Sequence, residues 1–536
     1  MKKRKPSKPV FKSYVMNQIS LMPRSYEEVI PSNNLVRIVN QAVEDINIDG
    51  LLGQYVGGGT SSYHPKMMLK VLVYAYCKKI YTSRKIAEAL EENLYFKWIA
   101  AENTPDFRTI NEFRGKRMKA VIAEVFSTVV EYLIAGGYIK LENYYLDGTK
   151  IEADANKHKV VWEKRKNRYE QNVKVQIKAL LQVIEEENAK EEAEYGERDL
   201  EAKGGTGTED VTAEQLKKKI EELNTRLKNM ANVEEKEEEV KKNKSAKQAL
   251  KKLEKDCLPR LEKYEHQTQT LAGRRSYSQT DPDATCMKMK EDRGAEKAWP
   301  KPAYNIQIGT EGQYIVGYSV HNNGGDPNCL IEHMEGVRNG LGKLPKNLVA
   351  DAAYGSEENY VYTKEKKMGN FLKYNTFYQD THNYRNPEVI QKHQFRAYNF
   401  KYDAEKDEFI CPNQKRLSYL YTGSYKSDNG FESKRRHYEC KECQDCPLKS
   451  QCTKAKDNRR IQISFELIEY RRQARENLTS EEGQKLRENR SVEVETVFGD
   501  IKHNMGFRRF HLRQIGKAKT EWGLVCIAHN MRKLAG

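Results

Sequence analysis

Three acidic residues occur in settings that suit metal-dependent chemistry. Asp147 follows the apolar run NYYL, Asp351 follows LVA, and Glu495 lies in the basic segment VETVFGDIKHNMGFRRF. Hard cations such as Mg²⁺ prefer oxygen ligands and keep positions open for phosphate. Two such ions can hold the attacking and leaving oxygens of an in-line phosphoryl displacement. The trio therefore indicates phosphoryl transfer, and the net charge of +16 favours nucleic acid as the substrate.

The two aspartates are predicted to lie at one edge of a sheet. Each is expected where a strand ends, and the ligands of open α/β sheets collect at the carboxyl ends of strands. Parallel neighbouring strands would bring both carboxylates to the same edge. Gly148, directly after Asp147, would let the backbone approach a ligand closely. A helix or turn cap is the competing interpretation of either aspartate by itself.

Helical geometry selects the third acid. On a uniform α-helix, Glu495 and Lys502 are separated by about 700° and share one face. Glu493 lies about 200° from Glu495 and points elsewhere. Lys502 is therefore expected beside the metal site, where it would reach a phosphate.

A basic and aromatic strip follows Lys502. Its pattern suits tracking along a nucleic-acid backbone and stacking on bases. The predicted contacts are Arg508, Arg509 and Arg513, interleaved with Phe507, Phe510 and His511. An amphipathic helix with solvated charges is the competing interpretation.

Five cysteines lie close together in the sequence, with the spacing Cys440-x2-Cys443-x2-Cys446-x5-Cys452 preceded by Cys411. Cys-x2-Cys spacing lets two thiolates bind one Zn²⁺, and four ligands close a tetrahedral structural site. We expect Cys411, Cys440, Cys443 and either Cys446 or Cys452 to be the ligands. An iron–sulfur cluster and ordinary thiols are the alternatives.

Composition bounds the class of protein. A chain of 536 residues is expected to form about two to four domains. Lys and Arg (93) outnumber Asp and Glu (77), which favours a polyanionic partner over a generically basic protein. There is no apolar run of about 18 residues, which predicts no membrane span. The basic start lacks the apolar stretch of a signal peptide, so we expect a cytoplasmic, nucleoid-associated protein with a phosphate-binding N-terminal arm.

The segment from about residue 33 to 140 has helical periodicity. Two short helices near its middle could form a helix-turn-helix that enters the major groove of DNA. A small helical bundle for dimerisation is the alternative. The basic residues that favour DNA are Arg84, Lys85, Arg108, Arg114 and Arg117.

From about residue 157 to 266, charged residues with Leu and Ile at heptad-like spacing predict a coiled-coil hairpin, broken near residues 204–208. Strand patterns then return. AYNIQIGTEGQYIVGYSV predicts a hairpin that turns at residues 309–312, followed by a helix and the strand before Asp351. That order predicts an α/β domain in which an antiparallel hairpin is extended by a parallel strand through a helical crossover.

In order and spacing, the passages LDGTKIEA, TDPDA, YNIQIG, VADAAYGSEEN, VETVFGDIKHNMGFRRF and IAHNMRKL resemble the DDE transposases of bacterial insertion sequences. The resemblance implies a ribonuclease H-like catalytic domain with Asp147, Asp351 and Glu495 as metal ligands and Lys502 as the motif lysine. The family's third motif has the form Tyr-(2)-Arg-(3)-Glu-(6)-Lys. Here Ser491 stands at the arginine position, the nearest basic residue is Arg490, and the tyrosine is absent.

The resemblance also implies a function. The chain is expected to bind the terminal inverted repeats of its element as a homodimer, cut them with two Mg²⁺ or Mn²⁺ ions, and join the freed 3′ ends to target double-stranded DNA. A domesticated DDE endonuclease and an inactive DNA-binding assembly protein are the alternatives.

The expected fold class is α/β: a ribonuclease H-like domain with a coiled-coil and a Cys-rich insertion, after an all-α N-terminal domain. The predicted parts are a basic arm and linker (1–32), a helical domain (33–140), the first part of the catalytic domain (141–156), a coiled-coil insertion (157–266), the continued catalytic domain (267–380), a zinc-knuckle-like insertion (381–465) and a C-terminal helical part (466–536).

Overall fold

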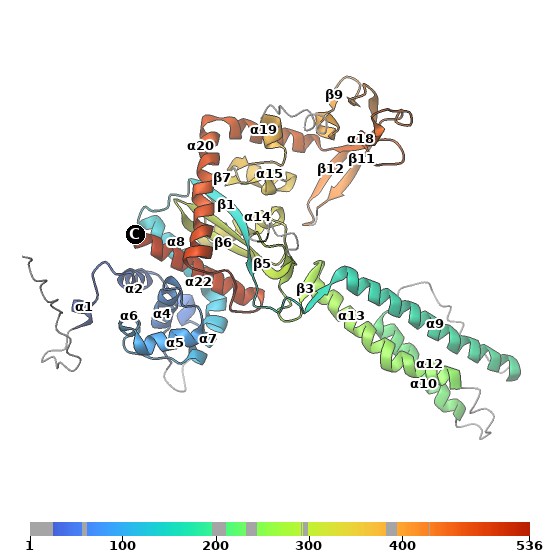
Figure 1. Ribbon diagram of the computed structural model, residues 1–536, viewed down its shortest axis with the longest axis horizontal. Coiled ribbons are helices and arrows are strands. Elements are labelled where there is room, and N and C mark those ends of the chain that lie inside the picture. The colour runs from blue at the N-terminus through green and yellow to red at the C-terminus, as the bar shows by residue number, and fades with distance from the viewer. Residues whose placement is uncertain are drawn as a thin grey trace, which may run out of the picture.

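The computed structural model describes residues 25–55, 62–195, 211–231, 244–290, 292, 299–381, 394–427 and 429–536. Residues 1–24 of the predicted basic arm, and the predicted break at residues 204–208, lie outside the described residues. Figure 1 shows a group of helices beside a central sheet, a long helical arm, and a smaller β-rich module. The chain is thus a mixed α/β protein with a helical N-terminal region.

The described residues between Tyr26 and Ala135 form a series of helices joined by turns. Its elements are α1 (Tyr26–Val29), α2 (Leu35–Asp45), α3 (Asp49–Leu52), α4 (Pro65–Cys77), α5 (Ser83–Glu92), α6 (Leu94–Ile99), α7 (Phe107–Glu112), the π-helical turn η1 (Phe113–Arg117) and α8 (Met118–Ala135). Nearly all of α4 is buried, as expected of a helix that is apolar on every side. Two short helices were predicted near the middle, but the structure has three, because α6 lies between α5 and α7.

A six-stranded mixed sheet forms the centre of the molecule. Its strands are β1 (Asn143–Glu152), β4 (Thr285–Met287), β5 (Lys301–Glu311), β6 (Tyr314–His321), β7 (Asn347–Ala350) and β8 (Gly369–Leu372). The order is β4-β5-β1-β7-β8, and β6 also pairs with β5. β1 is antiparallel to β5 and parallel to β7, which is parallel to β8. The predicted hairpin with a parallel extension is therefore present.

The hairpin turn differs from its prediction by a few residues. β5 continues through Glu311, and the turn is made by Gly312 and Gln313, whose φ angles are +57° and +63°. Two consecutive positive φ angles define the tight hairpin turn whose twist matches that of the strands. The earlier glycine, Gly309, lies inside β5, where an added Cβ would be 1.8 Å from the ring of Tyr144.

Helices cover both faces of the sheet. On one face lies α14 (Leu330–Leu341), the crossover from β6 to β7, whose His333 Nε2 is 2.6 Å from the buried Tyr144 hydroxyl. Near the opposite face runs the helical segment that carries Glu495: α20 (Glu481–Arg490), η6 (Ser491–Glu495), α21 (Thr496–Gly499) and η7 (Asp500–Asn504). The last helix, α22 (Ile515–Leu534), packs against β6, α4 and α8. Its Asn530 amide pairs with the N–H and C=O of Ile315 at the edge of the sheet.

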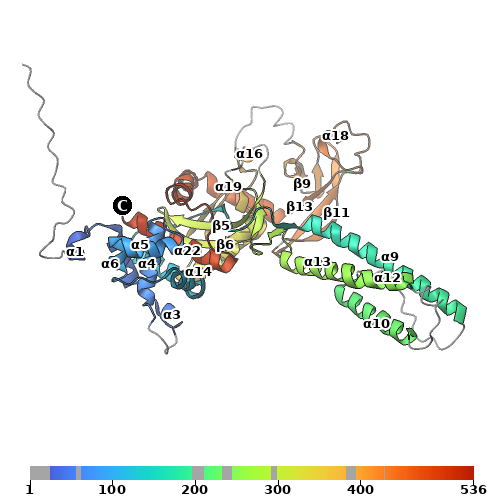
Figure 2. The ribbon, with the colours of Figure 1, turned by 60° about the horizontal axis from the view of Figure 1, so that its bottom comes forward.

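The helical arm leaves the sheet after β1 and returns before β4 (Figures 1 and 2). It contains α9 (Glu163–Tyr195), α10 (Ala213–Ala231), α12 (Lys244–Lys252), the π-helical turn η2 (Leu253–Cys257) and α13 (Leu258–Leu271). Leu, Ile and Val side chains from these helices form a core of their own that includes Val173, Leu216 and Leu261. β2 (Val160–Trp162) and β3 (Ser276–Ser278) pair at the base of the arm.

The β-rich module follows β8. Its sheet has the order β13-β12-β11-β10-β9, built from β9 (Lys401–Asp403), β10 (Glu408–Ile410), β11 (Arg416–Lys426), β12 (Glu432–Glu439) and β13 (Arg460–Ile463). The short helical elements between β8 and the end of the module are α16 (Phe377–Thr381), η5 (Ala397–Asn399) and α18 (Lys449–Cys452). Those in the connections of the central sheet are η3 (Pro327–Cys329), before α14, and η4 (Ala352–Tyr354) and α15 (Glu357–Glu365), between β7 and β8. The chain then continues into α19 (Phe465–Thr479), which leads to α20. None of the described helices is long and apolar enough to span a bilayer.

Candidate active site

Asp147 and Asp351 occupy equivalent positions on neighbouring parallel strands. The pairing of β1 with β7 ends at Leu146 and Ala350, and each aspartate is the next residue. β7 ends there, as predicted, and Asp351 accepts a hydrogen bond from the Ala353 N–H. Asp147, in contrast, lies inside β1, which continues to Glu152, so the predicted strand end after Leu146 is wrong.

Gly148 has a different role from the one predicted. It lies inside β1, and an added Cβ would be 2.3 Å from the Gln307 side-chain nitrogen, so a glycine leaves room for that side chain. Its carbonyl oxygen accepts a hydrogen bond of 2.7 Å from Lys290. The glycine therefore permits close packing on the face away from Asp147.

Glu495 ends a π-helical turn, η6, and Lys502 lies in a second one, η7. The uniform α-helix assumed in the angle calculation is therefore wrong. Glu493 nevertheless points away from the aspartates, because its carboxylate accepts a hydrogen bond of 2.6 Å from the Gln313 N–H. Lys502 is buried and donates a hydrogen bond of 2.7 Å to Thr149, two residues after Asp147 on β1. Asp147 and Thr149 share a face of the strand.

Arg490 lies between the three acids. Its guanidinium nitrogens are 3.3 Å from Asp147 Oδ2, 3.8 Å from Asp351 Oδ2 and 3.8 Å from Glu495 Oε1. The side chains become more exposed along the series, from 10% for Asp147 to 40% for Asp351 and 63% for Glu495. The three carboxylates therefore converge closely enough for one cationic group to reach all of them.

The π-helical turn accounts for the unusual sequence position of Arg490. An i→i+5 hydrogen bond encloses one residue more than the i→i+4 bond of an α-helix. Arg490, five residues before Glu495, is thereby placed against the acids although the resembling motif has its arginine four residues before. Arg490 thus lies beside the acids, although the motif position for arginine, residue 491, is a serine. Sequence reasoning missed this because a π-helical turn leaves no readable pattern.

Lys290 was also missed by sequence reasoning. It comes from the loop after β4, and no pattern in that loop marks it. Burial raises the pKa of Asp147, and the Asp351 carboxylate adds to this, whereas Lys290 and Arg490 act in the opposite direction. Burial therefore destabilises the charged form of Asp147, and any cation placed beside it stabilises that form.

The predicted basic and aromatic strip is corrected in part. Phe507 and Phe510 are each 1% exposed and pack against Trp522, so they cannot stack on bases. Arg509 and Arg513 are exposed, but both form ion pairs with Asp154.

Arg508 donates to the Lys502 carbonyl and contacts His503. It is exposed. The strip therefore offers three exposed arginines on a buried aromatic base.

In the N-terminal region, Arg114 does not fit its predicted role. It is 2% exposed and donates to the Tyr76 hydroxyl and the Tyr81 carbonyl, so it stabilises the helical core. Arg84, Lys85 and Arg108 are exposed, and the guanidiniums of Arg84 and Arg108 lie over the Phe107 ring.

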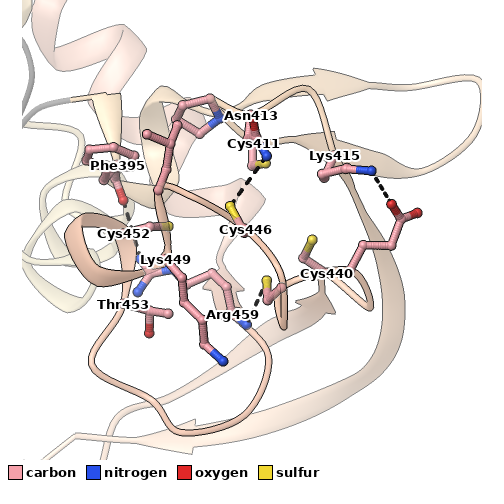
Figure 3. A pocket seen from close by; sticks show the side chains of 14 residues that line it. Phe395, Cys411, Asn413, Lys415, Cys440, Cys446, Lys449, Cys452, Thr453 and Arg459 are labelled. Atoms are coloured by element: carbon pink, nitrogen blue, oxygen red, sulfur yellow. Dashed lines mark hydrogen bonds and ion pairs between the residues drawn. The ribbon is translucent and has the colours of Figure 1, made fainter.

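The five cysteines of the β-rich module line one small cavity of about 20 Å³ (Figure 3). That volume holds about one water-sized particle. Cys443 accepts a hydrogen bond from the Arg459 N–H, and Cys446 accepts one from the Asn413 amide. Burial raises the pKa of the Cys440 thiol to about 12, and the neighbouring Cys443 and Cys411 add to this. A cation placed beside the Cys440 sulfur would favour its thiolate form.

Neither cluster has ready-made metal geometry. In the part of the chain that the structure describes, no group of three or more His, Cys, Asp or Glu side chains is arranged to hold a metal ion. At the acid site, Arg490 lies where a cation would be held. The donor types still fit: carboxylate oxygens suit Mg²⁺ or Mn²⁺, and thiolates suit Zn²⁺.

Two protein-family models match the chain, one near each end. Residues 410–535 match a model described as a transposase DDE domain, and residues 24–116 match a transposase domain (DUF772). The first match includes Glu495, Arg490 and the cysteine cavity, while Asp147 and Asp351 lie outside both. Comparison with curated proteins and with solved structures found no match.

The chain is therefore a transposase with a DDE domain and an N-terminal transposase domain, as the resemblance in sequence indicated. A domain of this class implies DNA binding, divalent cations and phosphoryl transfer on DNA.

Proposed function

We propose that this transposase binds the terminal inverted repeats of its own insertion sequence, cuts the strands there and transfers the freed 3′ ends to target DNA. Asp147, Asp351 and Glu495 are the proposed catalytic carboxylates. The observation that carries this is the convergence of all three on the Arg490 guanidinium. Bringing three carboxylates together is unfavourable because they repel one another. Their convergence from β1, from the end of β7 and from a distant helical segment is therefore best explained by a function that needs them together.

The arrangement of strands supports a ribonuclease H-like domain. A three-stranded antiparallel part, extended by two parallel strands, presents its acids on β1 and directly after β7. The helical segment with Glu495 approaches from the face of β1 that carries Asp147. We expect this scaffold to position DNA rather than react with it, because in phosphoryl transfer positioning and charge neutralisation supply the rate.

The three carboxylates would hold two Mg²⁺ or Mn²⁺ ions, which activate water or a 3′-OH and neutralise phosphate charge. Lys502, fixed by Thr149, and Lys290, fixed by the Gly148 carbonyl, are placed to attract the phosphate beside Asp147. Arg490 would exchange its carboxylate partners for a phosphate oxygen. Two ends must be joined, so we propose a homodimer as the active form.

A second metal site is proposed in the β-rich module. Four of Cys411, Cys440, Cys443, Cys446 and Cys452 would bind one structural Zn²⁺, as Cys-x2-Cys spacing suggests. The support is that all five line a cavity with room for about one small particle. This ion would stabilise the module and take no part in the chemistry.

The proposal is tested with Asp147→Asn, assayed on a duplex of the genomic DNA that flanks the gene, with Mg²⁺ present. We expect end binding to persist and cleavage to be lost. Asp154→Asn, an acid beyond the end of β1 with only surface ion pairs, is the matched control and should cut normally. Full cleavage by Asp147→Asn would refute the assignment. Cleavage by the parent protein without strand transfer would instead indicate an endonuclease, and binding without cleavage an inactive assembly protein.

A further inference from the structure

In the outer half of the β11–β12 ribbon, β11 is largely exposed, whereas β12 is partly covered, with Ser433 buried. Beyond Tyr421, β11 is exposed at nearly every residue, and the ribbon extends from the cysteine cavity toward the central sheet (Figure 1). No described element pairs with the outer half, because β13 pairs β12 only from Arg436 to Glu439. This part of the ribbon is therefore available to a partner.

One face of the ribbon carries an ordered row of aromatic and cationic side chains. The Tyr421 and His437 rings, opposite each other across the two strands, stack at 4.4 Å with an interplanar angle of 14°. Gly423 is opposite Arg435, and a Cβ on it would lie 3.3 Å from the His437 ring. Arg435 lies 3.4 Å over the Tyr425 ring. Along this face, the stacked Tyr421 and His437 rings are followed by the gap at Gly423 and then by the Arg435 guanidinium over the Tyr425 ring.

The charges on the ribbon differ in how they are neutralised. Arg416 is paired with Asp403 and Glu408, and Arg436 is paired with Asp407. Among the described residues, Arg435 and Lys434 have no carboxylate within ion-pair distance. A guanidinium that lies over an aromatic ring keeps its N–H donors available for an anion. A guanidinium paired with a carboxylate already uses those donors, and its charge is neutralised. Arg435 is therefore fixed in place while still able to bind an anion.

The tip of the ribbon contacts α15, the helix that begins six residues after Asp351. Ser427 and Asn429 hydrogen bond to Glu358, in the first turn of α15. The Ser356 side chain caps that helix, five residues after Asp351. Glu357, in the same turn, accepts a hydrogen bond from Ser464, which caps α19. Both the ribbon and the start of α19 are thus anchored on the element that follows the second aspartate.

We propose that this ribbon face, defined by Tyr421, Tyr425, Arg435 and His437, binds the sugar–phosphate backbone of the DNA duplex that flanks the cut site. The inference rests on the proposed function, since the duplex would reach the ribbon from the acid site. Arg435 supplies the charge, and the tyrosine hydroxyls and His437 supply further hydrogen bonds to phosphate. Such contacts hold the duplex in register without reading its sequence.

The test measures the affinity for a fluorescent duplex as a function of salt, in the Asp147→Asn background so that no DNA is cut. Each phosphate contact contributes about 0.9 to the slope of log K against log salt. Arg435→Ala is expected to reduce the slope by about one, whereas Lys434→Ala, on the opposite face of the ribbon, should leave it nearly unchanged. Arg416→Ala, an exposed arginine of the same strand pair that is already neutralised, is the matched control and should leave the slope unchanged.

The outcomes separate the two proposals. If the parent protein binds the duplex and Arg435→Ala keeps its slope, the ribbon proposal is overturned and the proposed function stands. If the parent protein does not bind DNA at all, both are overturned. If Arg435→Ala alters the oligomeric state in gel filtration and not the salt slope, the face binds a second copy of the chain and the DNA proposal fails. A reduced slope for Arg435→Ala, together with normal cleavage of a short duplex that ends near the cut when Asp147 is intact, supports a flanking contact.

Discussion

The acid site and the cysteine cavity are two candidate metal sites of opposite construction. The acids come from three elements separated by more than 300 residues, from Asp147 to Glu495, and they grow more exposed from 10% to 63%. The cysteines come from within 42 residues, Cys411 to Cys452, and enclose a cavity of about 20 Å³. One site is open and faces a cation of the protein itself, while the other is closed around sulfur. Openness suits a site that must admit DNA, and closure suits one that only holds its module together.

The two clusters also differ in the electrostatic repulsion among their side chains. Carboxylates repel one another, and here the protein supplies Arg490 to offset the repulsion. Thiols are neutral until a metal binds, so the cysteine cavity needs no internal cation. At the first site a protein cation therefore lies among the acids, whereas no cationic side chain has to leave the second before an ion can bind. The experiments below test this contrast.

The largest effect is expected at the exposed acid. Glu495→Gln should lower Mg²⁺-dependent cleavage about a thousandfold or more, because charge stabilisation by a metal ion is worth several kcal/mol. Glu493→Gln, two residues earlier and bound to the Gln313 N–H, is the control and should cut at nearly the parent rate. Single-turnover cleavage of a labelled end measures both. The reverse result would show that the wrong glutamate has been assigned to the site.

The next effect is expected at the cysteine cavity. Cys443→Ser should lose bound Zn²⁺ and lower the stability of the module by about 3 kcal/mol or more, since a structural zinc site contributes folding energy directly. Elemental analysis and protease resistance of the module report the two changes. Cys286→Ser, a cysteine outside the module, should alter neither. If the purified parent chain folds fully and contains no zinc, the closed cavity is a packing feature and the comparison fails.

A smaller effect is expected when the internal cation is removed. Arg490→Ala should tighten Mn²⁺ binding about tenfold, equivalent to 1.4 kcal/mol, because the guanidinium no longer competes for the carboxylates. Calorimetry with the metal alone measures this without requiring activity. Arg487→Ala, three residues earlier and placed over the Phe377 ring, should leave the affinity unchanged. Weaker metal binding by Arg490→Ala would show that the arginine organises the acids instead of competing.

The smallest effect concerns the support of the helical segment. Asp500 in η7 accepts a hydrogen bond from His529 of α22, and this lowers the pKa of the Asp500 carboxyl. Asp500→Asn should therefore cost about 1–2 kcal/mol of stability at neutral pH. A carboxyl with a lowered folded-state pKa stabilises above its unfolded value of about 3.9, and this contribution disappears as the pH falls through the lowered value. Urea melts of parent and variant should thus converge in strong acid, and a constant difference would contradict the explanation through the His529 hydrogen bond.

Much of this architecture was readable from local pattern. The strand before Asp351, the helix of the crossover and the hairpin all follow from apolar periodicity and turn residues, which act over a few neighbours. The family followed from short motifs in a fixed order, and two family models confirm it. Where the local pattern was ambiguous, the predicted boundaries were wrong. The strand does not end after Leu146, and the hairpin turns at Gly312 and Gln313.

Side-chain exposure was the less predictable quantity. Arg114 and the two phenylalanines after Lys502 looked like surface groups because their neighbours are basic, yet they are buried by helices that are distant in sequence. Exposure depends on which elements pack together, and charge patterning in one segment does not reveal that. The aromatic and cationic row on the β11–β12 ribbon is a similar case, since it exists only when the two strands are paired in their observed register.

The sequence by itself determined the transposase family, the acidic and thiol residue types, and the order of strands and helices, because these depend on composition and on neighbours along the chain. Only the tertiary structure decided that Arg490 faces all three acids. A π-helical turn shifts that arginine by one residue, and the parallel register of β1 with β7 sets the two aspartates level. The first feature is a one-residue change in local helical hydrogen bonding that leaves no sequence pattern, and the second is hydrogen bonding between strands that are distant in sequence.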